Sequence, residues 1–254
     1  MKTLKNILLT TLPSVIVLLI LLEVFFRTVI RADDPPRSMY DVQEQMFYFS
    51  NKKETGITTR GRFAEIRAKW RINNMHWNYP TDYYPRQDKK LIAVIGDSYI
   101  EAFQVDTDKK YPFLLGNMLK NDYDVYAFGI SGAPLSQYLN ISRYVRRHFN
   151  PDIIIINTVH NDFDESINQL NPGNNWFLKV SLNEDGSITE TIPQPKMDLP
   201  QYKPWKRLLY KSALFRYVYL NLCIKEIPHQ LTAHSKNKFE ANVKLDEVNV
   251  NKPF

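Results

Sequence analysis

Three apolar runs, each followed by a polar or glycine-containing turn, constrain the fold of this chain more than any other feature. The runs are residues 91–95, 124–128 and 152–159. The first is a continuous apolar run, which is typical of a strand buried on both faces of a sheet, and the other two are mostly apolar and also predict strands. Two amphipathic stretches, 112–120 and 134–149, lie between them and predict helices, the second opened by a proline. The alternation predicts βαβ units, and therefore an α/β fold with a parallel sheet covered by helices on both faces.

The turns that follow the three strands carry the polar groups of interest. They are Gly96-Asp97-Ser98, the stretch 129–132, and His160-Asn161-Asp162. In a parallel α/β sheet the ligand crevice lies at the carboxyl ends of the strands. We therefore expect the three turns to meet in one crevice.

The N-terminal residues predict a membrane anchor. Residues 7–26 are almost wholly apolar and long enough for a helix that crosses a hydrocarbon core of ~30 Å. Lys2 and Lys5 precede this stretch, and no convincing small-x-small cleavage site follows, so residues 1–32 are interpreted as an uncleaved, single-pass signal anchor. The very short N-terminal flank favours a periplasmic or otherwise extracytoplasmic soluble domain. Glu23 is interpreted as a helix-end carboxylate that reaches the interface.

The rest of the chain divides into three parts. Residues 33–88 form an extracytoplasmic segment of irregular or short-strand structure, rich in aromatic residues. Residues 89–200 form the α/β domain, with a β-hairpin inserted where 176–182 and 187–192 flank a glycine turn. Residues 201–254 contain a helix at 205–226 and then a polar tail that we expect to be poorly ordered.

Composition excludes several classes of protein. The chain has 254 residues, 44% hydrophobic and 24% charged, which predicts a folded core. Its net charge of +6 is spread among 27 acidic residues without a basic stripe, so no nucleic-acid partner is expected. The single cysteine, Cys223, excludes an internal disulfide and is interpreted as a buried thiol. The histidines lack metal-ligand spacing, so neither a metal nor a cofactor is expected, and the oligomeric state is left open.

The same turns carry motifs of a known family. We name residues 96–99, Gly-Asp-Ser-Tyr, the nucleophile block; residues 129–132, Gly-Ile-Ser-Gly, the glycine block; and residues 161–162, Asn-Asp, the asparagine block. In this order they resemble the SGNH hydrolases, also called GDSL esterases. The resemblance implies a three-layer, flavodoxin-like α/β sandwich. The longer string 96–105 resembles a membrane-anchored bacterial branch, some of whose members modify acyl groups on cell-surface polysaccharide.

The residue types suit acyl transfer. A serine hydroxyl is a poor nucleophile, so it must lie exposed on a tight turn where a base can reach it. The oxyanion that forms needs preorganised donors. The resemblance assigns the nucleophile to Ser98 and the donors to the N–H groups of Ser98 and Gly132 and the side-chain amide of Asn161. Each has a simpler interpretation: Ser98 as a helix N-cap, Gly132 as a turn glycine, and Asn161 as a loop amide.

The sequence departs from the family pattern in two places. Val159 stands where the family usually has a glycine, two residues before the asparagine. The family's Asp-x-x-His block, which supplies the general base, is not found. Residues 226–229, Glu-Ile-Pro-His, have the right spacing with glutamate in place of aspartate, which makes His229 a candidate base. His160 is interpreted as structural or substrate-contacting, and His76 as a packed surface histidine.

Two functions remain open at this point. The first is a membrane-anchored esterase, or a related acyltransferase, that acts on acyl esters of a carbohydrate or lipid; the absent histidine block leads us to expect the N-terminal part of a longer enzyme. The alternative is a catalytically inactive, membrane-tethered glycan-binding or assembly protein. The partners expected in the first case are the acylated substrate and, through the N-terminal helix, the membrane.

Overall fold

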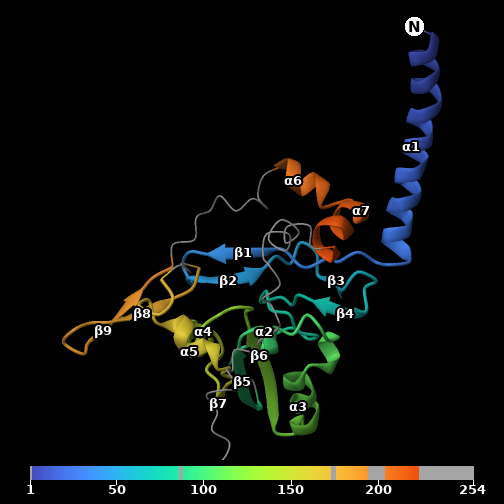
Figure 1. Ribbon diagram of the computed structural model, residues 1–254. Helices are drawn as coiled ribbons and strands as arrows, with labels where there is room; N and C mark the ends of the chain where they lie inside the picture. Colours follow the sequence, from blue (N-terminus) through green and yellow to red (C-terminus); the bar gives the residue numbers. More distant parts are fainter. Residues whose placement is uncertain (1, 86–87, 173–175, 194–203, 223–254) are drawn as a thin grey trace, which may run out of the picture.

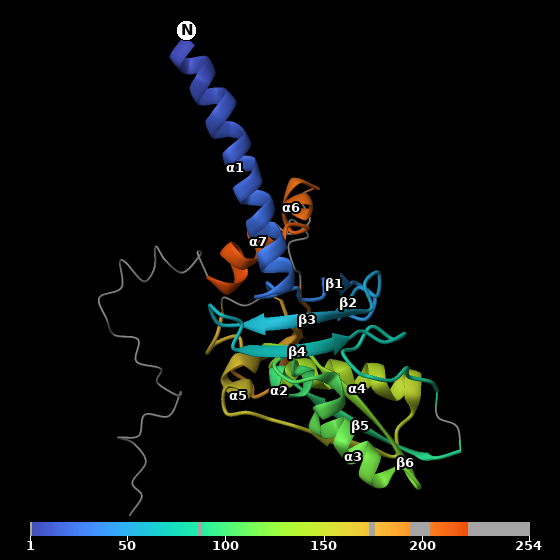
Figure 2. The same cartoon turned by 90° about the vertical axis from the view of Figure 1, so that its right-hand side faces the viewer.

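The chain folds into layers stacked below a long N-terminal helix. A computed structural model describes residues 2–85, 88–172, 176–193 and 204–222. Helix α1 (Lys2–Thr28) projects from the rest of the molecule, as Figure 1 shows. Two short β-hairpins follow it, and the α/β domain lies on their far side from α1 (Figure 2). The predicted order of anchor, short-strand segment and α/β domain is thus also an order in space.

The α/β domain is built on a parallel sheet with strand order β6-β5-β7. The central strand β5 (Lys90–Gly96) pairs with β6 (Tyr123–Gly129) on one side and with β7 (Ile153–Ile156) on the other. The sheet lies between helices α3 (Tyr111–Leu119) and α4 (Leu135–Phe149) (Figure 1). The predicted α/β fold with a parallel sheet is confirmed.

Helix α4 illustrates how the sequence specifies this packing. Pro134 lies at its N-cap, where the missing N–H of proline costs nothing. Tyr138, Ile141 and Val145 recur at helical spacing, and all three are fully buried. Asn150 ends the helix in the left-handed conformation that asparagine tolerates well. This apolar face fixes α4 against the core that also contains β5.

The two edges of the sheet differ. Along β6, the Tyr83 hydroxyl donates to the Ala127 carbonyl at 2.9 Å and accepts from the Ala127 N–H at 2.8 Å. The Tyr79 hydroxyl donates to the Val125 carbonyl at 2.7 Å. Tyrosine side chains therefore occupy the β6 edge. On the β7 edge, Ile153 and Ile156 are 42% and 47% exposed, and no strand among the described residues pairs with it.

Three antiparallel hairpins complete the described structure. They are β1 (Ser38–Asp41) with β2 (Met46–Phe49), β3 (Thr55–Arg60) with β4 (Ile66–Arg71), and β8 (Lys179–Leu182) with β9 (Ile188–Thr191). The first two confirm the predicted short-strand segment. The third lies where the sequence predicts a β-hairpin.

Two predicted elements were too long. The helix expected at 205–226 is divided into α6 (Pro204–Leu209), α7 (Ala213–Arg216) and a π-helical turn (Tyr217–Asn221). It breaks because Ser212 is extended and its hydroxyl caps α7, accepting from the Phe215 N–H at 3.2 Å. The third predicted strand ends at Ile156 rather than at 159. The predictions for Cys223 and for the tail lie outside the described residues.

Candidate active site

Ser98 lies at the end of the central strand. Strand β5 ends at Gly96, and Ser98 is the first residue of the short helix α2 (Ser98–Glu101). Asp97 caps this helix by accepting from the Tyr99 N–H at 3.0 Å, and the Ser98 hydroxyl donates to the second Asp97 oxygen at 3.3 Å. Asp97, rather than Ser98, is therefore the N-cap. The half-buried Ser98 hydroxyl is left on the tight turn that the sequence predicts.

The glycine block follows β6 and packs directly against α2. A Cβ added at Gly129 would lie 2.1 Å from the Glu101 backbone nitrogen, so only glycine fits at this position. Glycine at position 129 lets the backbones of β6 and α2 approach each other. Gly132 has φ +73°, which does favour glycine.

A buried carboxylate connects the two blocks. Glu101, at the end of α2, accepts hydrogen bonds from both the hydroxyl and the N–H of Ser131. Burial raises the pKa of Glu101, while the two Ser131 donors and the nearby Lys110 oppose that shift. The residue that precedes Gly132 is thus held by the same helix that begins with Ser98. Sequence reasoning did not identify Glu101; its place three residues after Ser98 was the available signal.

The asparagine block opens helix α5 (Asn161–Ser166). The Asn161 amide donates to Glu165 Oε1 at 3.0 Å, one turn along the same helix. Asp162 is buried and accepts from the Val159 N–H and from the Tyr138 hydroxyl, both at 2.8 Å. The Asp162 carboxylate therefore fixes the turn in which Val159 replaces the family's glycine.

The strand ends come close enough to interact electrostatically. Burial raises the pKa of Asp162, and the negative charges of Asp97 and Glu165 raise it further. The Asp97 charge acts in the same direction on the pKa of Glu101, after the larger effect of burial. Because Asp97 follows β5, Glu101 ends α2 and Asp162 follows β7, carboxylates from separate segments lie at the carboxyl edge of the sheet. Sequence reasoning named Asp162 only as part of a motif and did not foresee its partner Tyr138.

The described histidines differ in position. His160 is exposed and directly precedes α5, at the carboxyl end of the sheet. His76 Nδ1 lies 2.9 Å from the Phe49 carbonyl oxygen, and its ring packs on Tyr48, so it is a packed histidine as interpreted from the sequence. His148 lies 3.1 Å from the carboxylate of Glu44. The candidate base His229 lies outside the described residues. Within the described ranges, no group of three or more His, Cys, Asp or Glu side chains could hold a metal ion.

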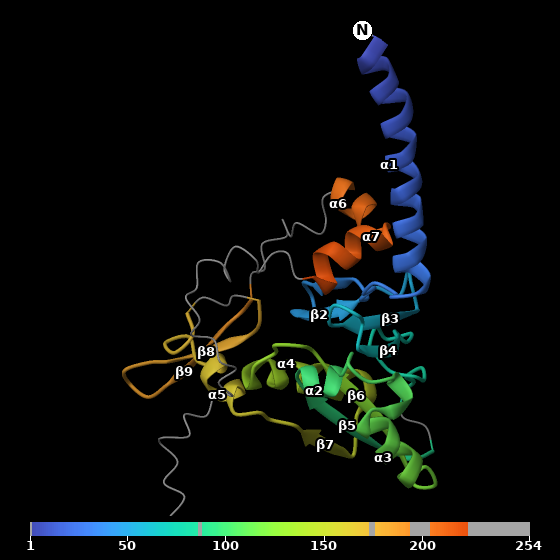
Figure 3. The same cartoon turned by 45° about the vertical axis from the view of Figure 1, so that its right-hand side comes forward.

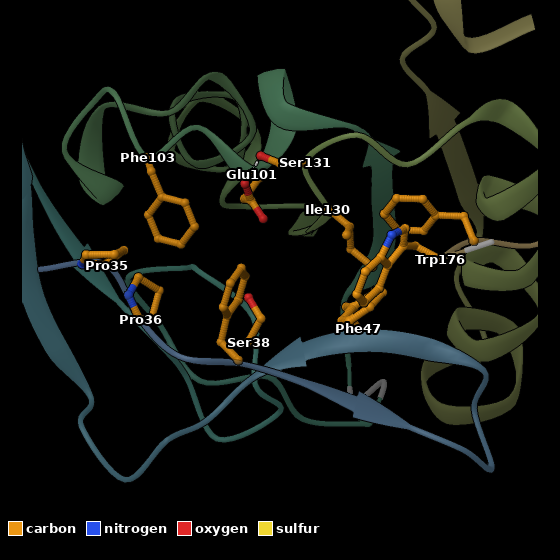
Figure 4. Close-up of a pocket in the computed structure, with 11 residues that line it drawn as sticks. Pro35, Pro36, Ser38, Phe47, Glu101, Phe103, Ile130, Ser131 and Trp176 are labelled. Carbon is orange, nitrogen blue, oxygen red and sulfur yellow. Dashed lines mark hydrogen bonds between the residues drawn. The ribbon is translucent and has the colours of Figure 1, made fainter. Parts of the chain in front are cut away.

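An apolar pocket of about 390 Å³ adjoins the glycine block (Figure 4). Figure 4 shows the carboxylate of Glu101 facing into it, with Pro36 and Ser38 across the pocket. Phe177 lines the pocket and also lies 3.9 Å from a Cβ added at Gly132. The Phe177 ring therefore lies between the pocket and Gly132. The remaining lining residues are mostly aromatic or apolar: Pro35, Phe47, Phe49, Phe103, Ile130, Ser131 and Trp176.

The fold and the site define an α/β protein with a serine-bearing turn at the carboxyl edge of a parallel sheet. Residues 92–202 match the GDSL-like Lipase/Acylhydrolase family, a range that includes Ser98, Gly132 and Asn161. The matched region supports the resemblance to the GDSL esterases that the sequence motifs indicated. Searches of curated proteins and of solved structures each returned no match.

The contact between Glu101 and Ser131 leads to a first prediction. Glu101→Ala is expected to slow the reaction of Ser98 with a serine-reactive fluorophosphonate by about 10²-fold, because a small displacement of a catalytic loop has an effect of that size. Glu101→Gln, which keeps one acceptor, should react faster than the alanine variant. The second-order rate constant of labelling measures this. Glu184→Ala, on the exposed β8–β9 turn, is the matched control. A folded Glu101→Ala protein that reacts at the wild-type rate would contradict the prediction.

Proposed function

We propose that this protein is a membrane-anchored esterase, or a related acyltransferase, with Ser98 as its nucleophile. The observation that carries the proposal is the position of Ser98: it begins α2 at the end of the central strand, and Glu101 of the same helix holds the glycine block beside it. The substrate is an O-acyl ester on a carbohydrate or a lipid. The match of residues 92–202 to the acylhydrolase family supports ester cleavage as the class of reaction.

The proposed reaction proceeds through an acyl-enzyme. Ser98 Oγ attacks the ester carbonyl carbon and gives its proton to a general base. The backbone N–H groups of Ser98 and Gly132 and the Asn161 amide stabilise the oxyanion, for which Asn161 must release Glu165. The alcohol leaves with the proton from the base. Water or a second hydroxyl group then attacks the acyl-enzyme, which gives hydrolysis or transfer respectively.

The pocket beside the glycine block is the proposed site for the acyl group. Its volume of about 390 Å³ falls within the range of small-molecule sites, and its walls are mostly aromatic and proline side chains. Phe177 places this apolar space next to Gly132, where the carbonyl oxygen of the substrate would lie. An apolar acyl chain would therefore gain burial while its carbonyl stays at the strand ends.

Helix α1 is the proposed anchor. Its segment Leu9–Thr28 has a mean hydropathy of 2.4, and none of it is buried within the protein. Such a helix is expected to lie in lipid, because its apolar side chains would otherwise face water. Specific contacts to α7 and to the π-helical turn after it support retention of α1 as part of the mature fold: Glu23 binds the start of α7, and Phe26 stacks on Tyr217 of the turn at 3.9 Å between ring centroids. The soluble part is proposed to be extracytoplasmic.

Fluorophosphonate labelling of the full chain in detergent tests the proposal. We expect one covalent adduct, located at Ser98 by peptide mass spectrometry, and its complete loss in Ser98→Ala. If Ser98→Ala melts at the wild-type temperature, the adduct is lost because the nucleophile is missing and not because the variant fails to fold. Slower labelling of His160→Ala or His229→Ala would identify the base. An unlabelled but folded wild-type protein would refute the esterase proposal.

One observation favours the alternative of an inactive glycan-binding protein. Within the described part of the chain, the Ser98 hydroxyl is bonded to Asp97, and the Asn161 amide is bonded to Glu165. Neither group is arranged for catalysis in this state. The alternative predicts no adduct at Ser98, together with saccharide binding that is the same in wild type and Ser98→Ala, measured by calorimetry.

A further inference from the structure

The short helices α6 and α7 lie beside the C-terminal half of α1 (Figure 3). The Glu23 carboxylate of α1 accepts from the Ser212 hydroxyl at 2.7 Å, from the Ala213 N–H at 2.9 Å and from the Leu214 N–H at 3.0 Å. Arg27 donates to the Lys211 carbonyl at 3.0 Å. These contacts fix the start of α7 beside the turn of α1 that contains Glu23 and Arg27.

The turn that contains Glu23 lies inside the apolar segment of α1, Leu9–Thr28. Glu23 precedes Thr28, the end of the helix, by five residues, or about 7.5 Å along the axis. A cavity of about 470 Å³ between the two helices extends the contact further; its walls are Ile16, Leu19, Ile20, Glu23, Val24, Ser212 and Leu214. Ile16 lies about 18 Å before the end of α1. If α1 spans a bilayer, Ser212 and Leu214 are therefore at the depth of hydrocarbon.

Helix α6 carries an exposed apolar face at the same side of the molecule. Trp205 and Leu208 are 57% and 67% exposed, and Leu209 beside them is 39% exposed. They occupy positions i, i+3 and i+4, so they share one face of the helix. Lys206 and Arg207 stand between Trp205 and Leu208 in the sequence, and Lys211 follows two residues after Leu209. An apolar face with tryptophan and flanking lysines is typical of helices that lie in a membrane interface.

We propose that residues 204–214 enter the bilayer beside α1, with lipid acyl chains covering Trp205, Leu208 and Leu209 and filling the cavity next to Ile16. The occupant is lipid because this surface continues the exposed apolar surface of α1 and lies at the same depth. Glu23 is then shielded within the membrane by the donors at the start of α7. The inference rests on the proposed anchoring by α1 and adds a second element that holds the soluble domain to the membrane.

Cysteine accessibility in lipid nanodiscs tests this inference. In a Cys223→Ser background, Leu208→Cys is compared with Leu182→Cys, a leucine of β8 that is 52% exposed and distant from α1. A bulky, charged maleimide should label Leu208→Cys at least tenfold more slowly than Leu182→Cys, and labelling in denaturant should be equal. Fluorescence quenching by lipids brominated on their acyl chains should be largely lost in Trp205→Phe.

The outcomes separate this inference from the anchoring proposal. A protein that incorporates into nanodiscs but labels equally fast at both positions would overturn the inference and leave anchoring intact. A protein that does not incorporate at all would overturn both. Slow labelling at Leu208→Cys without quenching through Trp205 would also overturn it, because a protein contact and not lipid would then cover α6.

Discussion

Gly129→Ala is expected to destabilise the protein by more than about 3 kcal/mol, at or beyond the upper end of what overpacking of a core usually costs. The added Cβ would lie 2.1 Å from the backbone nitrogen and 2.8 Å from the Cα of Glu101, and 2.6 Å from the carbonyl carbon of Ile100. Because all three are backbone atoms, no side-chain rotation relieves the overlap. Helix α2 must move away from β6, and Ser98 moves with it.

Thermal unfolding of the full chain in detergent measures this effect. A loss of that size should lower the melting temperature by about 10 °C or more. Gly116→Ala is the matched control, because this glycine lies within α3 and the nearest atom to its added Cβ, on Val125, is 3.3 Å away. Alanine is favoured over glycine in a helix, which offsets the tight contact with Val125, so this control should change the melting temperature much less than Gly129→Ala does. Equal melting temperatures of the two variants would contradict the assigned packing.

Lys110 is expected to make the stability of the protein depend on pH above neutrality. Its side chain is 1% exposed, and its ammonium donates to the carbonyls of Asn78, at 2.8 Å, and Glu101. Burial lowers the pKa of Lys110 to about 7, and the negative charge of Glu101 opposes that shift. The unfolded chain has the ordinary value of 10.5. Between these two values the unfolded chain binds a proton that the folded chain does not, so raising the pH favours folding.

The expected change in the free energy of unfolding follows from 1.36 kcal/mol per pH unit for one proton. From pH 7 to pH 9.5, the free energy of unfolding of the wild type should rise by about 3 kcal/mol relative to Lys110→Met, in which the group is absent. Denaturant titrations at several pH values give this difference. Lys109→Met, at the neighbouring exposed lysine, should track the wild type at every pH. A constant difference between wild type and Lys110→Met across this range would rule out a neutral Lys110.

The sequence predicted the sheet well, because its strands are mostly apolar and the buried central strand is a continuous apolar run. The run 91–95 became β5 nearly residue for residue, and Pro134 marked the start of α4. The third strand was predicted to continue to Val159, but it ends at Ile156, and the Asp162 carboxylate accepts a hydrogen bond from the Val159 N–H in the turn that follows. Local pattern cannot reveal a contact made by a side chain beyond the strand.

The candidate site was predicted less completely. The motif residues Ser98, Gly132 and Asn161 were identified through the resemblance of their blocks to the SGNH hydrolases, and their catalytic roles remain predictions. The contacts that hold them depend on pairings between distant residues, such as Glu101 with Ser131 and Asp162 with Tyr138, which no periodicity encodes. The broken helix at 204–221 was missed for the same reason, because its break is stabilised by Glu23 from the other end of the chain.

The two edges of the sheet differ in whether they can pair with an additional strand. On one side, the tyrosine hydroxyls have already taken the hydrogen bonds that a new strand would need at Val125 and Ala127. On the other, the outer edge of β7 presents exposed isoleucines without a strand partner in the described residues. A fourth strand can therefore join only beside β7. If it ran parallel to β7, it would end near Asn161, and the first side chains after it would lie at the carboxyl edge of the sheet, where Ser98 begins α2.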